Sequence, residues 1–219
     1  PGVIEHRTGR IRSSPIFREI NVDFADEMTR RLGAPTIIER DAHAVTLAHH
    51  WFGSARDLND MVLISLEQTL GLGVLHDNQL FRGAGGLSHN LGDLVLSAGS
   101  AGTVRLASQA GENAILGARS ADGRFAEAIR LGRGMQHAQT LVKAEDNELI
   151  NAAIRAGSAV GVTLANIVTL FAPPLVIIVG SSLELGAPFI NALQDAYETA
   201  VPPSLKGVAE LVFHNSSDE

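Results

Sequence analysis

Three polar side chains that could do chemistry, Arg40, Asp41 and His43, lie close together in the sequence. A carboxylate within hydrogen-bond reach of a hydroxyl can act as a general base, and a guanidinium binds carboxylates or phosphates through paired hydrogen bonds. Asp is also a favoured N-cap residue, so a purely structural role for Asp41 at the start of a helix is an open alternative. Further polar residues follow later in the chain: His89, Asn90, Asp93 and Arg105.

The composition excludes several kinds of chemistry. The 219 residues include no Cys, so disulfides, thiol catalysis and cysteine-ligated metals are excluded. The net charge is −7, and without a basic run the chain has no surface built to bind nucleic acid by itself. Apolar residues at 45% and charged residues at 19% are typical of a globular chain with a substantial core.

Alternating strands and helices are predicted to position these residues, which indicates an α/β layer fold. Turn residues, helix caps and β-branched runs set the boundaries. The predicted elements are a hairpin over 3–13, a helix from Asn21 or Asp23 to Leu32, a strand over 36–39, a helix from Asp41 to Trp51, strands over 60–65, 71–76 and 79–82, glycine-rich turns over 83–102, helices over 103–117, 122–132 and 146–171, and a strand, helix and strand over 175–180, 187–200 and 208–214.

The least polar stretch, from Ala156 to Leu183, has the apolar length of a membrane span. Pro173 and Pro174 interrupt it, and a proline pair removes helical hydrogen bonds. The β-branched run that follows is typical of a buried strand. We therefore predict a helix, a break and a strand, and no membrane segment.

Several phrases, taken together, resemble the ROK family of repressors, open reading frames and kinases. They occur in the same order over nearly the whole chain and are Glu39-Arg40-Asp41-Ala42-His43-Ala44, Trp51-Phe52-Gly53, Leu66 to Val74, Leu80 to Ala84, Val168 to Pro173, and Val176 to Gly180. The resemblance implies an actin-like ATPase fold of the ribonuclease H-like type. It implies that residues 1–50 are the remainder of an incomplete first lobe and that 51–219 form the second lobe, with a helical segment over 103–171. We expect a winged helix and the opening strand pair of the fold to lie before Pro1.

The resemblance places Asp41 where the family's kinases carry their catalytic base. The preceding family Asn, a sugar ligand, is Arg40 here. The family's phosphate-binding Gly-Thr-Gly phrase falls on Glu67-Gln68-Thr69, and a carboxylate there repels phosphate oxygens. Gly71 and Gly73 are still glycines in this chain. They could belong to a phosphate-binding loop, or they could simply be strand or turn glycines of a hairpin. These departures predict that ATP binding is lost and that no residue is catalytic.

The family's sugar and zinc motifs are also replaced. The Glu and His of Gly-Glu-x-Gly-His fall on Asn90 and Asp93, and a later sugar-contacting Glu falls on Arg105. The three zinc-binding cysteines fall on Leu96, Ala98 and Thr103. Two hydrocarbon side chains cannot complete a tetrahedral zinc site, so we expect no metal and no cofactor.

The predicted ligand-binding set is therefore Arg40, Asp41, His43, His89, Asn90, Asp93 and Arg105. One interpretation is a pocket for a changed ligand, such as an acidic sugar or a sugar phosphate. The other is a degenerate site in which Arg40 or Arg105 simply pairs with Asp41 or Asp93.

Our leading hypothesis is the effector-binding and oligomerisation domain of a ROK-type transcriptional repressor, a pseudokinase rather than an enzyme. We expect it to be cytoplasmic, to form a homodimer, to bind a sugar or a sugar acid or phosphate, and to reach DNA only through an N-terminal segment outside this chain. The first alternative is an ATP-dependent sugar kinase that uses Asp41 as its base. A protein that binds no small molecule is the third hypothesis.

Overall fold

The computed structural model describes residues 3–14, 21–83, 86–87, 90–100 and 102–214. The chain divides into two compact units, one comprising residues 1–63 and 71–90 and the other residues 64–70 and 91–219. The boundary predicted near residue 50 concerned the lobes of the family fold, and it stays a prediction.

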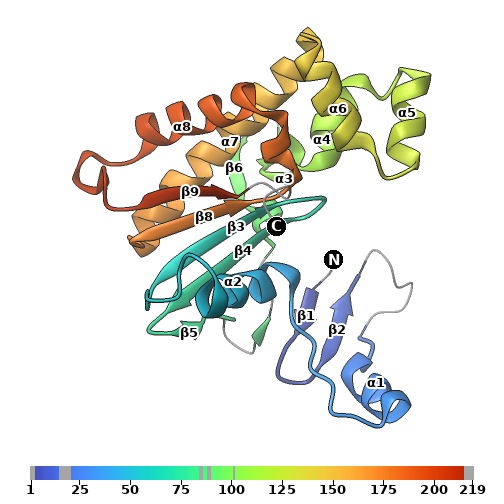
Figure 1. Ribbon diagram of the computed structural model, residues 1–219, viewed down its shortest axis with the longest axis vertical. Helices are drawn as coiled ribbons and strands as arrows, with labels where there is room; N and C mark the ends of the chain where they lie inside the picture. The colour runs from blue at the N-terminus through green and yellow to red at the C-terminus, as the bar shows by residue number, and fades with distance from the viewer. Residues whose placement is uncertain (1–2, 15–20, 84–85, 88–89, 101, 215–219) are drawn as a thin grey trace. The chain divides into compact units, whose positions relative to one another are not determined.

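The first unit opens with a hairpin and a helix. Strands β1 (Val3–Glu5) and β2 (Arg10–Ser13) pair antiparallel, with Glu5 opposite Arg10. Helix α1 (Phe24–Leu32) follows and ends at Gly33, whose left-handed backbone has φ of 66° (Figure 1). A residue without Cβ adopts this conformation at little cost. The predicted hairpin and helix are confirmed.

The strand predicted over 36–39 is wrong, because this segment belongs to no strand or helix. Its backbone groups bond to side chains instead: the Thr36 N–H donates to Thr29 Oγ1 at 3.0 Å, and the Ile38 carbonyl accepts from the His6 ring at 3.0 Å. Ile37 is 78% exposed, so the apolar residues that suggested a strand do not form a buried face.

Helix α2 (Asp41–Phe52) begins directly after this segment and packs on strand β4 (Leu70–His76). A Cβ on Gly73 of β4 would lie 1.8 Å from Thr46 Oγ1 and 3.1 Å from the Ala42 carbonyl oxygen, both on α2. Only a glycine allows this close approach. Gly73 is thus a packing glycine of the hairpin.

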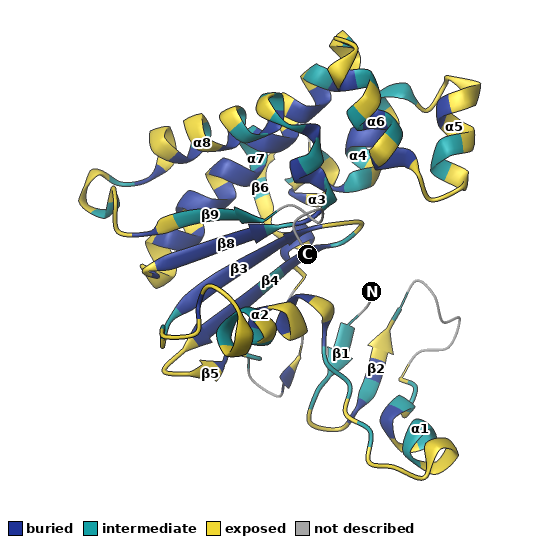
Figure 2. Ribbon diagram, viewed as in Figure 1, coloured by how far each residue is buried: buried dark blue, intermediate teal, exposed yellow. Residues whose placement is uncertain are grey.

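A five-stranded sheet has the order β5-β4-β3-β8-β9. Strand β3 (Met61–Leu66) is buried at every residue, and β8 (Leu175–Val179) nearly so (Figure 2). The turn from β4 to β5 (Gln79–Leu80) uses left-handed Asp77 and Asn78, with φ of 49° and 60°, as a two-residue hairpin requires. Strand β9 (Glu210–His214) runs parallel to β8, with Val179 opposite His214. The strands were predicted, although β5 is shorter than expected.

In the second unit, α7 (Asn147–Phe171) packs along α8 (Ala187–Ala200). A Cβ on Gly157 would lie 2.3 Å from the Phe189 carbonyl oxygen, and one on Gly161 would lie 2.2 Å from that of Leu193. Among the described helices, α7 alone has the length and apolar composition to cross a membrane, yet 56% of its apolar window is buried within the protein. That burial is typical of a core helix. The predicted break after α7 is confirmed, with Ala172 left-handed at φ of 41°.

The region from 83 to 143 differs most from prediction. Strands β6 (Val95–Gly99) and β7 (Gly102–Arg105) form a hairpin where we predicted turns and the start of a helix. Its residues are mostly exposed, so no alternation of apolar and polar residues indicated strands in advance. Four short helices follow: α3 (Ala107–Ala110), α4 (Glu112–Leu116), α5 (Gly123–Arg130) and α6 (Gly134–Lys143). Of these, α6 was not predicted.

Candidate ligand site at the start of α2

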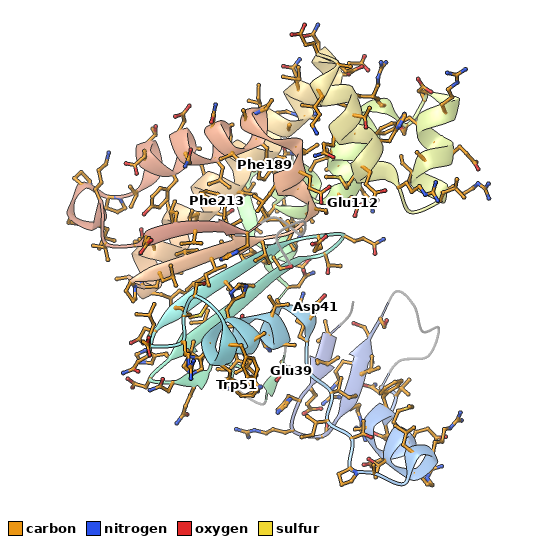
Figure 3. All side chains as sticks on the ribbon, in the orientation of Figure 1. Glu39, Asp41, Trp51, Glu112, Phe189 and Phe213 are labelled. Carbon is orange, nitrogen blue, oxygen red and sulfur yellow. The ribbon has the colours of Figure 1, made fainter. Side chains whose placement is uncertain are left out.

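The first turn of α2 brings together three of the predicted site residues. Arg40 is the N-cap residue, with extended φ and ψ of −74° and 146°, and Asp41 is the first helical residue (Figure 3). The proposed capping role of Asp41 is therefore wrong, because its Oδ1 accepts a hydrogen bond from the adjacent Ala42 N–H at 2.8 Å and makes no capping bond. A carboxylate in this first turn still gains from the positive end of the helix dipole.

Arg40 and Asp41 form a pair of opposite charge in which only the arginine is buried. Arg40 Nε lies 3.8 Å from Asp41 Oδ1, with the arginine side chain 7% and the aspartate 63% exposed. The pair corresponds to the degenerate-site alternative, in which the charges satisfy each other. It also presents an open carboxylate, and a carboxylate of this kind can accept hydrogen bonds from ligand hydroxyls.

Glu39 organises this turn, and we did not predict its role. Its Oε1 accepts from the Arg40 N–H at 3.0 Å and from His43 Nδ1 at 2.9 Å. Its Oε2 accepts from Arg82 Nε at 2.8 Å and lies 3.4 Å from His6 Nδ1. Three segments of the first unit therefore meet at one carboxylate.

The hydrogen bonds define the histidine tautomers at this carboxylate. His6 Nδ1 lies 3.0 Å from the Ile38 carbonyl oxygen, which can only accept, so this nitrogen carries the proton. His43 Nδ1 likewise donates to ionised Glu39. Partial burial acts to raise the pKa of Glu39, but hydrogen bonds from His43, Arg82 and the Arg40 N–H outweigh it and hold that pKa below its usual value.

The sequence pattern did not predict this cluster around Glu39. Glu39 and His43 are four residues apart, but Glu39 lies before the N-cap of α2, so helical spacing alone does not bring these two side chains together. His6 and Arg82 are far from Glu39 in sequence, with separations of 33 and 43 residues. Only tertiary folding brings those two side chains to it.

The remaining predicted site residues lie in other segments of the chain. Asn90 is exposed and belongs to the first unit. Asp93, in the short helix η2 (Leu91–Asp93), and Arg105, at the end of β7, belong to the second unit. Arg105 donates to the Asp93 backbone carbonyl at 2.5 Å. His89 lies outside the described residues, and the seven-residue ligand set as a whole stays a prediction.

The hairpin β6–β7 contains the positions that the resemblance assigned to zinc ligands. Ala98 and Thr103 are direct partners across the two strands, and Leu96 lies on the same β6 strand. Alanine and leucine offer no donor atom, so these residues do not fit a tetrahedral zinc site. Elsewhere in the described chain, Asp60, His76 and Asp77 have suitable ligand types at the surface. His76 Nδ1 there donates to Asp60 at 2.6 Å, and this bond raises the pKa of His76.

A second carboxylate, Glu67, lies in the turn between β3 and β4. Its Oε1 accepts the Ser181 N–H at 3.1 Å, at the start of the short helix η4 (Ser181–Leu185). Glu112, the first residue of α4, is half-buried nearby. Burial raises the pKa of Glu112, and the negative charge of Glu67 raises it further.

The ROK family model matches residues 1–218. The protein belongs to the ROK family. Solved ROK structures share its mixed α/β, actin-like sugar-kinase fold. They include a transcriptional regulator homologous to E. coli Mlc, with a TM-score of 0.78, 20% identity and coverage of 97% of this chain and 56% of that one. A Streptomyces griseus glucokinase in complex with glucose and AMPPNP gives a TM-score of 0.77 at 19% identity, over 97% of this chain and 73% of that one.

Relatives of this ROK protein include both functional branches. A xylose repressor of Caldicellulosiruptor bescii is 28% identical over 89% of this chain and 52% of its own length. A glucokinase of Thermotoga maritima is 27% identical over 97% of this chain and 71% of its own length. The chain thus spans about half the length of the repressor it matches. Similarity alone does not separate a regulator from a kinase, so the choice depends on the site residues.

Proposed function

We propose that this ROK protein is the effector-binding domain of a sugar-responsive transcriptional repressor and has no kinase activity. The observation that carries the proposal is the first turn of α2, where the open Asp41 carboxylate lies 3.8 Å from the guanidinium of buried Arg40. Hydroxyls of a sugar can donate to the carboxylate, and an acidic group on the sugar can pair with an arginine. The proposed ligand is a sugar, a sugar acid or a sugar phosphate.

Two features oppose the alternative of a sugar kinase. The β6–β7 hairpin has Ala98 and Thr103 where the resemblance requires zinc ligands. The turn after β3 carries Glu67, whose charge opposes a nucleotide phosphate. The relatives named as repressors support a regulatory function. The relatives named as glucokinases support the alternative of a sugar kinase, in which Asp41 would be the catalytic base.

The mechanism we infer is a population shift. A ligand that binds one conformation of the domain more tightly increases the population of that conformation. In a longer, dimeric repressor, this shift would alter the spacing of two DNA-binding segments and hence operator affinity. We propose that the protein works in this way in the cytoplasm.

A thermal-shift titration tests the proposal directly. The panel contains D-xylose, D-glucose, N-acetylglucosamine, D-glucuronate and glucose 6-phosphate, each with and without MgATP. A ligand at about 100 times its Kd adds about 2.7 kcal/mol to the unfolding free energy and raises Tm by several degrees. We expect one sugar class to raise Tm and MgATP alone to leave it unchanged.

Variants of Asp41 and Arg40 test whether the ligand binds at the start of α2. Asp41→Asn and Arg40→Asn are expected to weaken binding of the active sugar at least tenfold. Asp57→Asn removes the same charge at an exposed position and is expected to leave binding unchanged. Sugar-dependent consumption of ATP by the wild-type protein, abolished by Asp41→Asn, would instead establish the kinase alternative.

A further inference from the structure

The β1–β2 hairpin and α1 form a small body within the first unit, residues 3–14 and 21–33, which we call the hairpin body. The Ala25 N–H of α1 donates to the Gly9 carbonyl at 3.0 Å. A Cβ on Gly9 would lie 2.2 Å from Ala25 Cβ, so the hairpin packs directly on this helix. Apart from these two residues and Ile11, the described residues of the hairpin body are exposed or only partly buried. A segment with so little buried surface opens locally at a low cost in free energy.

His6 attaches the hairpin body to the rest of the first unit. Its backbone N–H donates to the Gly86 carbonyl at 3.0 Å. Its ring Nδ1 donates to the Ile38 carbonyl at 3.0 Å and lies 3.4 Å from Glu39 Oε2. Because the body buries little of its own surface, the strength of its attachment depends on single contacts of this kind.

The Glu39 carboxylate lies between His6 and the start of α2. Its Oε1 accepts the Arg40 N–H at 3.0 Å, and Arg40 is the N-cap residue of α2. Its Oε2, on the side of His6, accepts from Arg82 Nε at 2.8 Å and lies 2.7 Å from Arg82 Nη2. A carboxylate is rigid, so a rotation that moves one oxygen away from its partners also moves the other. The backbone of the candidate ligand site and the attachment of the hairpin body therefore share one group.

A ligand at the start of α2 acts on this shared group. A sugar that bonds to the side chains of both Arg40 and Asp41 restricts the backbone of the N-cap residue. It thereby favours the arrangement in which the Arg40 N–H donates to Glu39, and this arrangement keeps Oε2 beside His6. Coupling between two sites is reciprocal, so the attached hairpin body must in turn favour the ligand.

We propose that Glu39 and His6 couple effector binding at the start of α2 to the attachment of the hairpin body. The hairpin body stays attached when the site is occupied and opens more often when the site is empty. Glu39 and His6 are positioning residues in this mechanism and do not bind the effector themselves. The inference rests on the proposed function, because it requires a ligand at Arg40 and Asp41, and it adds the regulation of that site.

Isothermal titration of the whole chain with each compound of the thermal-shift panel, from D-xylose to glucose 6-phosphate, tests the coupling. In His6→Ala, the Kd of the compound that binds is expected to rise about fivefold, an ordinary size for a coupling between two sites. His6→Asn restores an N–H donor near the position of Nδ1 and should recover most of the affinity. His76→Ala is the matched control, since His76 is in the same unit but bonds to Asp60, and we expect its Kd to equal that of the wild type.

Amide hydrogen exchange at the His6 N–H, followed by NMR, measures the attachment itself. The bound compound should slow this exchange in the wild type but not in Glu39→Gln, where one carboxylate oxygen is replaced by an NH₂ group. Without any ligand, the His6 amide of Glu39→Gln should already exchange faster than that of the wild type. The Val168 amide in α7 is the reference for a folded chain and should exchange equally in both proteins.

The outcomes separate this proposal from the proposed function. Equal Kd values for the wild type and His6→Ala, or an unchanged exchange rate at His6 in Glu39→Gln, would overturn the coupling and leave effector binding intact. If no compound of the panel binds the wild type, the proposed function fails, and the coupling fails with it. If His6→Ala does not fold, exchange in Glu39→Gln decides, because that variant leaves the hairpin body unchanged.

Discussion

The start of α2 and the carboxyl edge of β3 and β8 each hold a partly buried glutamate, yet their pKa values move in opposite directions. At α2, hydrogen bonds from His43, Arg82 and a backbone N–H lower the pKa of Glu39 despite burial. At the strand edge, burial and the charge of Glu67 raise the pKa of Glu112. Burial alone therefore does not decide what a carboxylate does, because its partners determine the sign of the effect.

The two regions are also held together by different forces. The start of α2 depends on the Glu39 side chain, which is 18% exposed and connects three segments of the first unit. The strand edge depends on close backbone packing of Gly180 against Leu66. Substitutions in each region can test this contrast.

The largest effect is expected from Gly180→Ala. The new Cβ would lie 2.4 Å from a backbone oxygen, and the φ of 125° is unfavourable for any residue with a side chain. We expect the unfolding free energy to fall by about 3 to 5 kcal/mol, measured by urea denaturation. Gly123→Ala is the control, because nothing lies within 4 Å of its Cβ position and its φ is not positive. Equal stability of the two variants would show that the strand edge is not closely packed.

A smaller but substantial effect is expected from Glu39→Ala. The substitution leaves the Arg82 guanidinium and the rings of His6 and His43 without their common acceptor. We expect urea denaturation to show a loss of about 2 to 3 kcal/mol. Glu27→Ala breaks only exposed ion pairs with Arg30 and Arg31 and should lose less. If Glu39→Ala lost no more unfolding free energy than Glu27→Ala, Glu39 would not be the residue that holds this turn together.

The pH dependence of Glu39→Gln sharpens this result. The pKa of Glu39 is lower in the folded chain than its usual 4.5, so its ionised form favours folding. That stabilisation is fully present above the unfolded pKa and is lost as pH falls through the folded value. The stability difference between wild type and Glu39→Gln should therefore persist at neutral pH and shrink below about pH 4.5. A difference that grew on acidification would contradict the assigned direction.

The smallest effect, of opposite sign, is expected from Glu112→Gln. The folded pKa of Glu112 is raised above 4.5, so the protonated form favours folding below that pH, and this stabilisation is lost as pH rises through the folded value. An uncharged glutamine should then be more stable than wild type at pH 7 by about 0.5 kcal/mol, since Glu112 is only half-buried. The gain in Tm should disappear near pH 4.5. A destabilised variant at pH 7 would show that the ionised carboxylate has a favourable partner instead.

Some features of the protein were determined by the sequence itself. The absence of Cys excludes a cysteine-ligated zinc site in any fold. The β1–β2 hairpin, the helix ended by Gly33 and the strand–helix–strand unit at the end of the chain were predicted because turn residues, caps and β-branched runs act over a few neighbouring positions. The family phrases similarly predicted the fold.

The tertiary structure decided the rest. The 36–39 segment could not be distinguished from a strand until its backbone partners were known, and the exposed β6–β7 hairpin has no alternation of apolar and polar residues to indicate it. The Glu39 cluster and the bond from Ser181 to Glu67 join residues far apart in the chain. Local patterns do not contain such contacts, because they depend on how strands and helices pack once the whole chain has folded.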